Sequence, residues 1–298
     1  MTAPANLELL NRVAIVTGAG RGIGEAIASA FSRNGAAVVL VSRTGPELER
    51  VASALKDFGA RVSMFVGDVS NSNDVDRIVD ATAREYGRID VLVNAAAIHG
   101  SLGRTWECDP VHWSAAIQVN LFGAFLFCRK TIPYMLENKW GRIINFSGGG
   151  ATSPSPFLSA YGASKAALVR FTETLAAELT DSGIQVNAIA PGLVDTGIHD
   201  DLLNAPEIPA EILQPIRDLR NDGCGGVPKS LAATLAVFLA SSRSCGLTGK
   251  LIAAPHDDWQ KWDYRRITEL MAIPWLTLRR LDAFTLDQLS ACATPKDT

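Results

Sequence analysis

The sequence predicts an α/β protein in which helices cover both faces of a doubly wound parallel sheet. Short apolar runs alternate with helical patterns from residue 12 to about residue 190. Strands buried on both faces form continuous apolar runs, and their alternation with helices indicates βαβ units. The chain has 298 residues, of which 47% are apolar, enough for one large core. A glycine cluster separates the first strand from the first helix.

The elements follow in a regular order. Strands are expected at residues 12–17, 37–41, 62–66, 89–93, 143–146, 185–189 and 251–253. Helices are expected at about residues 26–34, 46–58, 73–86, 110–137, 161–179 and 228–241. Because no internal repeat or low-complexity linker interrupts this order, we interpret residues 1–298 as a single domain.

Two segments depart from the alternation. Residues 193–227 are polar and rich in proline and glycine, which indicates either a substrate flap or a plain surface excursion. Residues 254–298 form an atypical C-terminal extension. Its aromatic residues are Trp259, Trp262, Tyr264, Trp275 and Phe284. Such aromatic density is unusual in a disordered tail, so we expect the extension to pack on the body, the site or a neighbouring subunit.

Composition narrows the class of protein. The net charge of −3 and the absence of long basic runs give no support for nucleic-acid binding. No signal-peptide pattern and no apolar run long enough to span a bilayer are recognised. Five scattered cysteines without a CxxC pair argue against structural zinc and a disulfide framework. We expect a soluble, cytoplasmic protein with no metal and no membrane partner.

Two triplets resemble metal ligands, namely His199-Asp200-Asp201 and His256-Asp257-Asp258. Neither has the spacing of a metal site. Both lie in segments that could face a substrate, so a hydrogen-bonding role stays open.

The glycine cluster predicts a phosphate site. It runs from Thr17 to Gly24, between a strand and a helix. Glycines permit a tight turn and a close approach of phosphate to the backbone, while the helix N-terminus offers free N–H groups. A purely structural turn is the alternative. The expected cofactor contacts are Gly18, Gly20, Arg21, Gly22, Ile23 and Gly24.

The end of the second strand indicates which dinucleotide binds. An acid at this place commonly holds the ribose hydroxyls of NAD, but here the residues are Ser42, Arg43 and Thr44. A guanidinium suits a 2′-phosphate, so Arg43, assisted by Arg21, predicts NADP, with NAD as second choice. The alternative for Arg43 is a solvated surface residue.

Two further strand ends complete the nucleotide site. Asp68, followed by Val69, is placed to accept the adenine amino group or to cap a turn. Asn94, Ala95 and Ala96 follow the next strand, where small residues permit either close cofactor approach or tight packing.

Tyr161 and Lys165 predict the chemistry. Residues four apart lie on the same face of a helix. A nearby ammonium favours the phenolate, so we expect Lys165 to lower the pKa of Tyr161 and make it a usable proton donor and acceptor. A surface helix with an incidental Tyr and Lys is the alternative.

Together these motifs resemble the single-domain type of the short-chain dehydrogenase/reductase family, over residues ~10–250. They are TGxxxGxG at 17–24, Asp68, the Asn94 segment, Asn120, YxxxK at 161–165, and Pro191-Gly192 with Thr196. The resemblance implies that Tyr161 is the acid/base and that Lys165 contacts the nicotinamide ribose. It further implies that Asn120 supports a water link to the lysine. Pro191, Gly192, Val194 and Thr196 would cradle the nicotinamide.

The sequence departs from the family pattern in three places. Asn-Asn-Ala-Gly is Asn94-Ala95-Ala96-Ala97, and the usual Asp-Gly-Gly near the last strand is absent. The serine expected thirteen residues before the tyrosine is Gly148. We assign its role to Ser147, because the following glycines permit a bulge that re-aims the hydroxyl. The alternatives are Ser153, Ser155 or no serine.

The resulting hypothesis is an NADP(H)-dependent oxidoreductase that acts on a small carbonyl or alcohol and forms a homo-oligomer, a dimer or tetramer. A catalytically slow nucleotide-binding regulatory protein and an NAD-linked enzyme are the alternatives. The fold does not select a substrate, so a polycyclic or fatty ketone, a cyclitol and a sugar all stay open.

Overall fold

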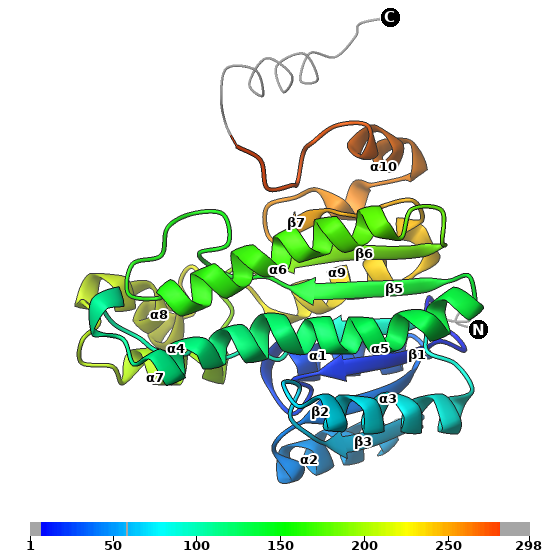
Figure 1. Ribbon diagram of the computed structural model, residues 1–298, viewed down its shortest axis with the longest axis horizontal. Coiled ribbons are helices and arrows are strands. Elements are labelled where there is room, and N and C mark those ends of the chain that lie inside the picture. The colour runs from blue at the N-terminus through cyan, green and yellow to red at the C-terminus, as the bar shows by residue number, and fades with distance from the viewer. Residues whose placement is uncertain (1–6, 58, 281–298) are drawn as a thin grey trace, which may run out of the picture.

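The computed structural model describes residues 7–57 and 59–280 (Figure 1). In this part of the chain one parallel seven-stranded sheet has the order β3-β2-β1-β4-β5-β6-β7. The strands are β1 (Val13–Thr17), β2 (Ala37–Ser42), β3 (Val62–Val66), β4 (Val91–Asn94), β5 (Gly141–Phe146), β6 (Ile184–Ala190) and β7 (Leu251–Ala253). The predicted doubly wound parallel sheet is confirmed.

Helices cover both faces of the sheet. One face carries α1 (Gly22–Arg33), α2 (Gly45–Asp57) and α9 (Lys229–Ala240), and the other carries α3 (Ser72–Tyr86), α5 (Gly123–Glu137) and α6 (Ser159–Glu178). Strand β1 contributes to both cores: Ala14 and Val16 pack with the first set of helices and Ile15 with the second. This follows because successive strand side chains point to opposite faces.

The helix expected at residues 110–137 is continuous but not uniform. It consists of α4 (Pro110–Ile117), a π-helical turn (Gln118–Phe122) and α5. Pro110–Glu137 is long and apolar enough to cross a bilayer by length and composition. The expectation that no apolar run is long enough does not hold for this helix, because its apolar residues outweigh polar ones such as Gln118 and Asn120. Since α5 packs against α3, β4 and β5, we assign it to the layer that covers the sheet.

Three helices lie where the sequence suggested irregular structure. They are α7 (Asp200–Leu203) and α8 (Ala210–Asp222) within residues 193–227, and α10 (Tyr264–Met271) in the extension. Helix α8 buries Leu213, Ile216 and Leu219 at a spacing of three. An internal proline, Pro215, hid this pattern, because proline normally ends or kinks a helix.

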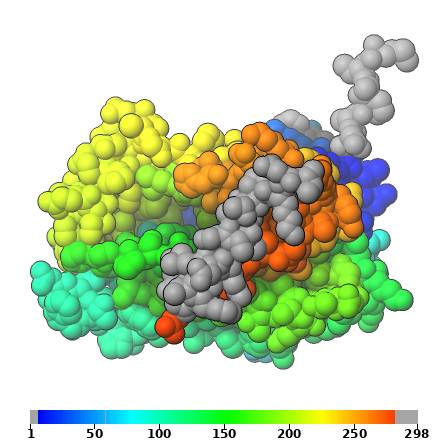
Figure 2. All heavy atoms as spheres, turned by 90° about the horizontal axis from the view of Figure 1, so that it is seen from above, coloured from blue at the N-terminus to red at the C-terminus, as the bar shows by residue number. Residues whose placement is uncertain are grey.

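The C-terminal extension packs on the body of the protein as far as residue 280, beside β7 and α6 (Figure 2). Trp259 is 2% exposed and donates its indole N–H to the carbonyl of Ala254. The amide of Leu251 in β7 donates to the carbonyl of Leu276 at 2.7 Å. The extension therefore lies along the outer edge of β7. Phe284 lies outside the described residues.

The strand order positions a binding site. Strands β1 and β4 are neighbours, but the chain leaves β1 for α1 on one face and continues from β4 toward α5 on the other. In open α/β sheets, ligands bind in the crevice outside the carboxyl ends of the strands at such a switch point.

Candidate active site

A cavity of about 680 Å³ opens at the carboxyl edge of the sheet. Its walls come from the segments that follow β1 to β6, from the start of α6, and from the segment that contains α7 and α8. A second hollow of about 470 Å³ is lined by residues between 256 and 276 of the extension. No extension residue up to residue 280 lines the large cavity, so within the described chain the extension does not border the substrate pocket.

The residues expected to contact the cofactor converge on this cavity, with Asn94 the exception. Those that line it are Gly18, Gly20, Arg21, Gly22, Ile23, Gly24, Ser42, Arg43, Thr44, Asp68, Val69, Ala95, Ala96, Tyr161, Lys165, Pro191, Gly192, Val194 and Thr196. The side chain of Asn94 instead points into the core, where it donates to Asn145 Oδ1 at 2.8 Å. The side chain of Asn94, the last residue of β4, therefore points toward β5 and not into the cavity, and a contact between Asn94 and the cofactor stays a prediction.

The glycine turn leaves no space for side chains. Gly18 has φ +67°, and a Cβ there would lie 2.9 Å from the amide nitrogen of Ala96. A Cβ on Gly24 would lie 2.2 Å from the carbonyl oxygen of Gly18. Helix α1 starts at Gly22. The side chain of Arg21, the N-cap residue just before the helix, makes no capping hydrogen bond. The free amides of the first turn thus face the cavity, an arrangement that fits a pyrophosphate.

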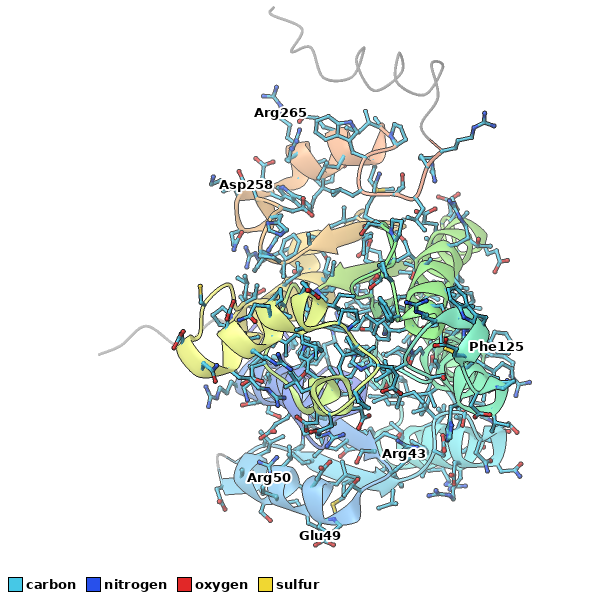
Figure 3. The ribbon with its side chains drawn as sticks, turned by 90° about the vertical axis from the view of Figure 1, so that its left-hand side faces the viewer. Arg43, Glu49, Arg50, Phe125, Asp258 and Arg265 are labelled. Atoms are coloured by element: carbon cyan, nitrogen blue, oxygen red, sulfur yellow. The ribbon has the colours of Figure 1, made fainter. Side chains whose placement is uncertain are left out.

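The end of the cavity beside β2 and α2, where the adenosine of the cofactor is expected and which is called the adenosine end below, carries charges of both signs. Arg43, at the end of β2, is exposed and lines the cavity (Figure 3). Glu47, on α2, lines the same end and pairs with Arg21 at 3.7 Å. Glu47 was not predicted as part of the site, because the acid expected at an NAD site ends the second strand, whereas this carboxylate comes from the following helix.

Asp68 serves the turn that follows β3. Its Oδ1 accepts hydrogen bonds from the amide of Ser70 at 2.9 Å and from the Ser70 hydroxyl at 2.6 Å. The residue caps a turn while it lines the cavity. The two roles left open for Asp68 are therefore compatible.

Tyr161 and Lys165 stand on the first turns of α6 and face the same cavity. Lys165 is 2% exposed, and its Nζ donates to the carbonyl oxygen of Phe146 at 2.7 Å. The same Nζ lies 5.6 Å from the centroid of the Tyr161 ring.

The expected lowering of the Tyr161 pKa is wrong for this structure. Burial raises the pKa of Tyr161 to about 12 and lowers the pKa of Lys165 to about 7. Both shifts have one cause, because a low-dielectric surrounding disfavours the charged form of either group. The sequence showed the spacing of Tyr161 and Lys165 but not how far the folded protein buries them.

Ser147 and Gly148 directly follow β5. The amide of Ser147 donates to the carbonyl of Ile189, so the ladder with β6 continues to this residue. Ser147 lines the cavity, and its buried Oγ has no hydrogen-bond partner among the described residues. A Cβ on Gly148 would lie 2.3 Å from Tyr161 Oη. The tyrosine hydroxyl thus takes the space that a side chain at position 148 would need.

Asn120 lies behind the cavity rather than in its wall. It sits in the π-helical turn, a feature frequent at functional sites. Its Oδ1 accepts from the amide of Ile98, and its Nδ2 donates to the carbonyl of Ile98 and to Ser164 Oγ, each at 2.9 Å. Ser164 Oγ in turn donates to the carbonyl of Tyr161. The Asn120 side chain therefore ties the loop after β4 to α6.

Two histidines complete the site. His99 lies in the loop after β4, and its ring meets the Tyr161 ring edge-on with centroids 4.9 Å apart. His199 precedes α7, and its ring centroid is 6.0 Å from that of His99. Both line the cavity. His99 was not predicted as part of the site, because a single histidine in a loop carries no spacing signal, and a hydrogen-bonding role for His199 had stayed open.

Comparison with known proteins gives consistent matches. The short chain dehydrogenase family profile matches residues 12–206. The (2S)-[(R)-hydroxy(phenyl)methyl]succinyl-CoA dehydrogenase subunit BbsD from Thauera aromatica is 36% identical to this chain, and the match covers 81% of this chain and 94% of BbsD.

Solved structures agree with these matches. A gluconate 5-dehydrogenase from Burkholderia cenocepacia, in complex with NADP and tartrate, superposes with TM-score 0.74 and 28% identity over 83% of this chain and 95% of its own. An NAD⁺-bound xylitol dehydrogenase gives TM-score 0.76 and 25% identity over 83% and 98%. The chain therefore belongs to the short-chain dehydrogenase/reductase family and is an NAD(P)-dependent oxidoreductase.

Proposed function

We propose that this enzyme interconverts a small carbonyl compound and its alcohol with NADP(H) as cofactor. The nicotinamide, when bound, supplies or accepts the hydride. The observation that carries the proposal is the convergence of Tyr161, Lys165 and Ser147 on one cavity, whose other end is the glycine turn.

Each side chain has a distinct task in reduction. Tyr161 Oη donates its proton to the carbonyl oxygen as negative charge develops there. Ser147 Oγ, buried and without a protein partner, donates a second hydrogen bond to the same oxygen. Lys165 stabilises the phenolate that remains, and Asn120 holds the start of α6 through Ser164. In alcohol oxidation the same proton path runs in reverse.

Replacement of Tyr161 tests the chemistry. Tyr161→Phe keeps the ring but removes the transferable proton, so turnover should fall by about 10²–10⁴-fold. Reduced-cofactor affinity, measured by fluorescence titration, should stay nearly unchanged. A panel of ketones and alcohols followed at the reduced-nicotinamide absorbance also separates an enzyme from a slow regulatory protein. Turnover of Tyr161→Phe within a few-fold of the parent would place the acid elsewhere.

The preference for NADP rests on Arg43, which lines the adenosine end where no acid follows β2. We expect NADPH to bind at least tenfold better than NADH. A tenfold preference needs about 1.4 kcal/mol, within the range of one charge-assisted hydrogen bond. Arg43→Asp should erase the preference, while Arg61→Asp, a surface change in the loop before β3, should preserve it.

An NAD-linked enzyme is the second candidate, and Glu47 is the observation that favours it. Its carboxylate lines the adenosine end and pairs with Arg21, so it would oppose a 2′-phosphate. Glu47→Gln separates the two cases. If NADP is the cofactor, this change strengthens NADPH binding further, whereas equal parent affinities for both cofactors would refute the preference.

Three further features belong to the proposal. Residues 193–227, whose α7 and α8 form part of the cavity wall, act as the substrate flap of a single domain. Homo-oligomer formation is supported by two exposed aromatic side chains, Phe122 of the π-helical turn and Phe125 of α5, whose rings stack at 5.7 Å. A cytoplasmic location is supported by four free cysteines among the described residues. Sedimentation analysis and cell fractionation test the last two.

A further inference from the structure

His99 and His199 form a polar wall beside Tyr161 that the proposed chemistry does not use. They come from segments one hundred residues apart in the sequence and approach to 6.0 Å between ring centroids. The edge contact to Tyr161, at 4.9 Å, places His99 next to the acid/base group. Both imidazoles line the cavity, so a bound substrate would meet them.

His99 is held in place from behind. Asn120 makes two hydrogen bonds to the backbone of the preceding residue, Ile98. The following residue, Gly100, is so close to α4 that a Cβ there would lie 2.7 Å from the Ala116 side chain. His99 is only 5% exposed. The ring is therefore fixed before any ligand binds.

One ring nitrogen of each histidine lacks a hydrogen-bond partner, although His199 also interacts with the backbone of Val194. Nδ1 of His99 and Nδ1 of His199 are both buried and have no hydrogen-bond partner among the described residues. A buried polar atom without a partner costs free energy. A ligand oxygen that reaches either nitrogen at hydrogen-bond distance would satisfy it.

The charge state of the wall favours an uncharged ligand group. Burial lowers the pKa of His99 to about 4, with contributions from His199 and Lys165, and burial also lowers the pKa of His199. Neutral imidazole offers one donor and one acceptor, as does a hydroxyl group. A carboxylate would find no cationic imidazole here, and Asp201 lines the same cavity.

An apolar cluster borders the same cavity. Leu158, Leu202 and Ile216 of this cluster line the cavity, and Tyr161 packs against it. Their side chains suit a hydrocarbon body. The cavity thus combines the two histidines near Tyr161 with an apolar surface.

We propose that His99 and His199 bind a second, uncharged oxygen on the carbon next to the reacting one, so that the preferred substrates are vicinal diols, α-hydroxy ketones or 1,2-diketones with an apolar body. This inference rests on the proposed function, since it takes Tyr161 as the group at the reacting oxygen. The two oxygens of a vicinal pair lie close together. Tyr161 and His99, whose ring centroids are 4.9 Å apart, are close enough to bind one of these oxygens each.

The test compares probes that differ in the second oxygen. Cyclohexane-1,2-diol, cyclohexane-1,4-diol, cyclohexanol and 2-hydroxycyclohexane-1-carboxylate are titrated calorimetrically into protein saturated with NADP⁺ and, separately, with NAD⁺. The parent should bind the 1,2-diol at least tenfold more tightly than the other three. The 1,4-diol controls for polarity, because it has the same composition but separates the oxygens.

Matched variants assign the preference to the wall. His99→Phe keeps a ring against Tyr161 but removes both nitrogens, and it should reduce the 1,2-diol preference about threefold or more. His199→Phe should do the same, and the double variant should abolish the preference. His99→Asn, which retains a donor and an acceptor, should recover part of it, as a purely structural role would not. His256→Phe, at an exposed histidine of the extension, should leave the preference unchanged.

Failure of this inference can be told from failure of the proposed function. Equal affinity for the four probes, strongest binding of the carboxylate, no detectable binding of any probe, or an unchanged preference in both His→Phe variants would overturn the inference. Binding needs no turnover, so a diol preference without oxidation of any alcohol would contradict the proposed function alone. Alcohol turnover without a diol preference would contradict the inference alone.

Discussion

The burial of Lys165 can be measured through the pH dependence of the free energy of unfolding. The side chain is 2% exposed, and burial lowers its pKa from 10.5 to about 7. In the unfolded chain the same group titrates near its ordinary value of about 10.4. Between these two values the unfolded state binds more protons than the folded state. The cost of burying Lys165 is therefore full below pH 7 and disappears as the pH rises toward 10.5.

The magnitude follows from these two pKa values. Within this window the free energy of unfolding rises by about 1.4 kcal/mol per pH unit for one proton. From pH 7 to pH 9.5, Lys165 should therefore make the folded protein more stable by about 3 kcal/mol. Lys165→Met keeps a stem of similar length but has no charge, so this gain should be absent from the variant.

The assay is urea unfolding of cofactor-free protein at pH 7, 8 and 9.5 and constant ionic strength, followed by fluorescence of the six tryptophans. The difference between parent and variant midpoints should change by roughly 1 M across the series, for an m-value near 3 kcal/mol/M. Lys261→Met, an exposed lysine on the extension, is the control and should follow the parent. Parallel midpoints for the parent and Lys165→Met at every pH would show that Lys165 is not buried as described.

Three further outcomes are expected. Gly148→Ala places a Cβ 2.3 Å from Tyr161 Oη, so kcat should fall at least tenfold with unchanged cofactor affinity, and full activity in this variant would contradict the geometry. Gly24→Ala places a Cβ 2.2 Å from the carbonyl oxygen of Gly18, so cofactor titration should show affinity reduced tenfold or more, and parent-like affinity would rule out this turn. Lys250→Met removes Nζ hydrogen bonds to two carbonyls of the extension, so limited proteolysis should cut the extension faster than in Lys261→Met, and equal rates would mean that these bonds do not hold it.

The sequence was sufficient for features that depend on local spacing. Buried parallel strands need apolar runs, and the turn after β1 needs glycine because Gly18 has a positive φ and Gly24 meets its carbonyl. Both requirements are written in consecutive residues. The pairing of Tyr161 with Lys165 on one helix face follows from their spacing of four in the same way.

The sequence was insufficient where a proline concealed a helical spacing of apolar residues. It was also insufficient where the direction of a side chain depended on the adjacent strand. Helix α8 carries Pro215, which concealed its spacing of apolar residues. Asn94 was expected just after the fourth strand; it is the last residue of β4, and its side-chain amide donates to Asn145 of the adjacent strand. The residues around Asn94 do not show which strand lies beside β4. The direction of the Asn94 side chain, toward the cofactor site or toward the core, could therefore not be predicted.

The sequence by itself therefore determined the sheet, the glycine turn and the placing of Tyr161 and Lys165 on one helix face, because each is encoded by periodicity or spacing within one segment. Only the tertiary structure decided the direction of the Tyr161 pKa shift and the meeting of His99 with His199. Burial depth and contacts between distant segments set these properties, and both arise only when the loops after separate strands close over one cavity.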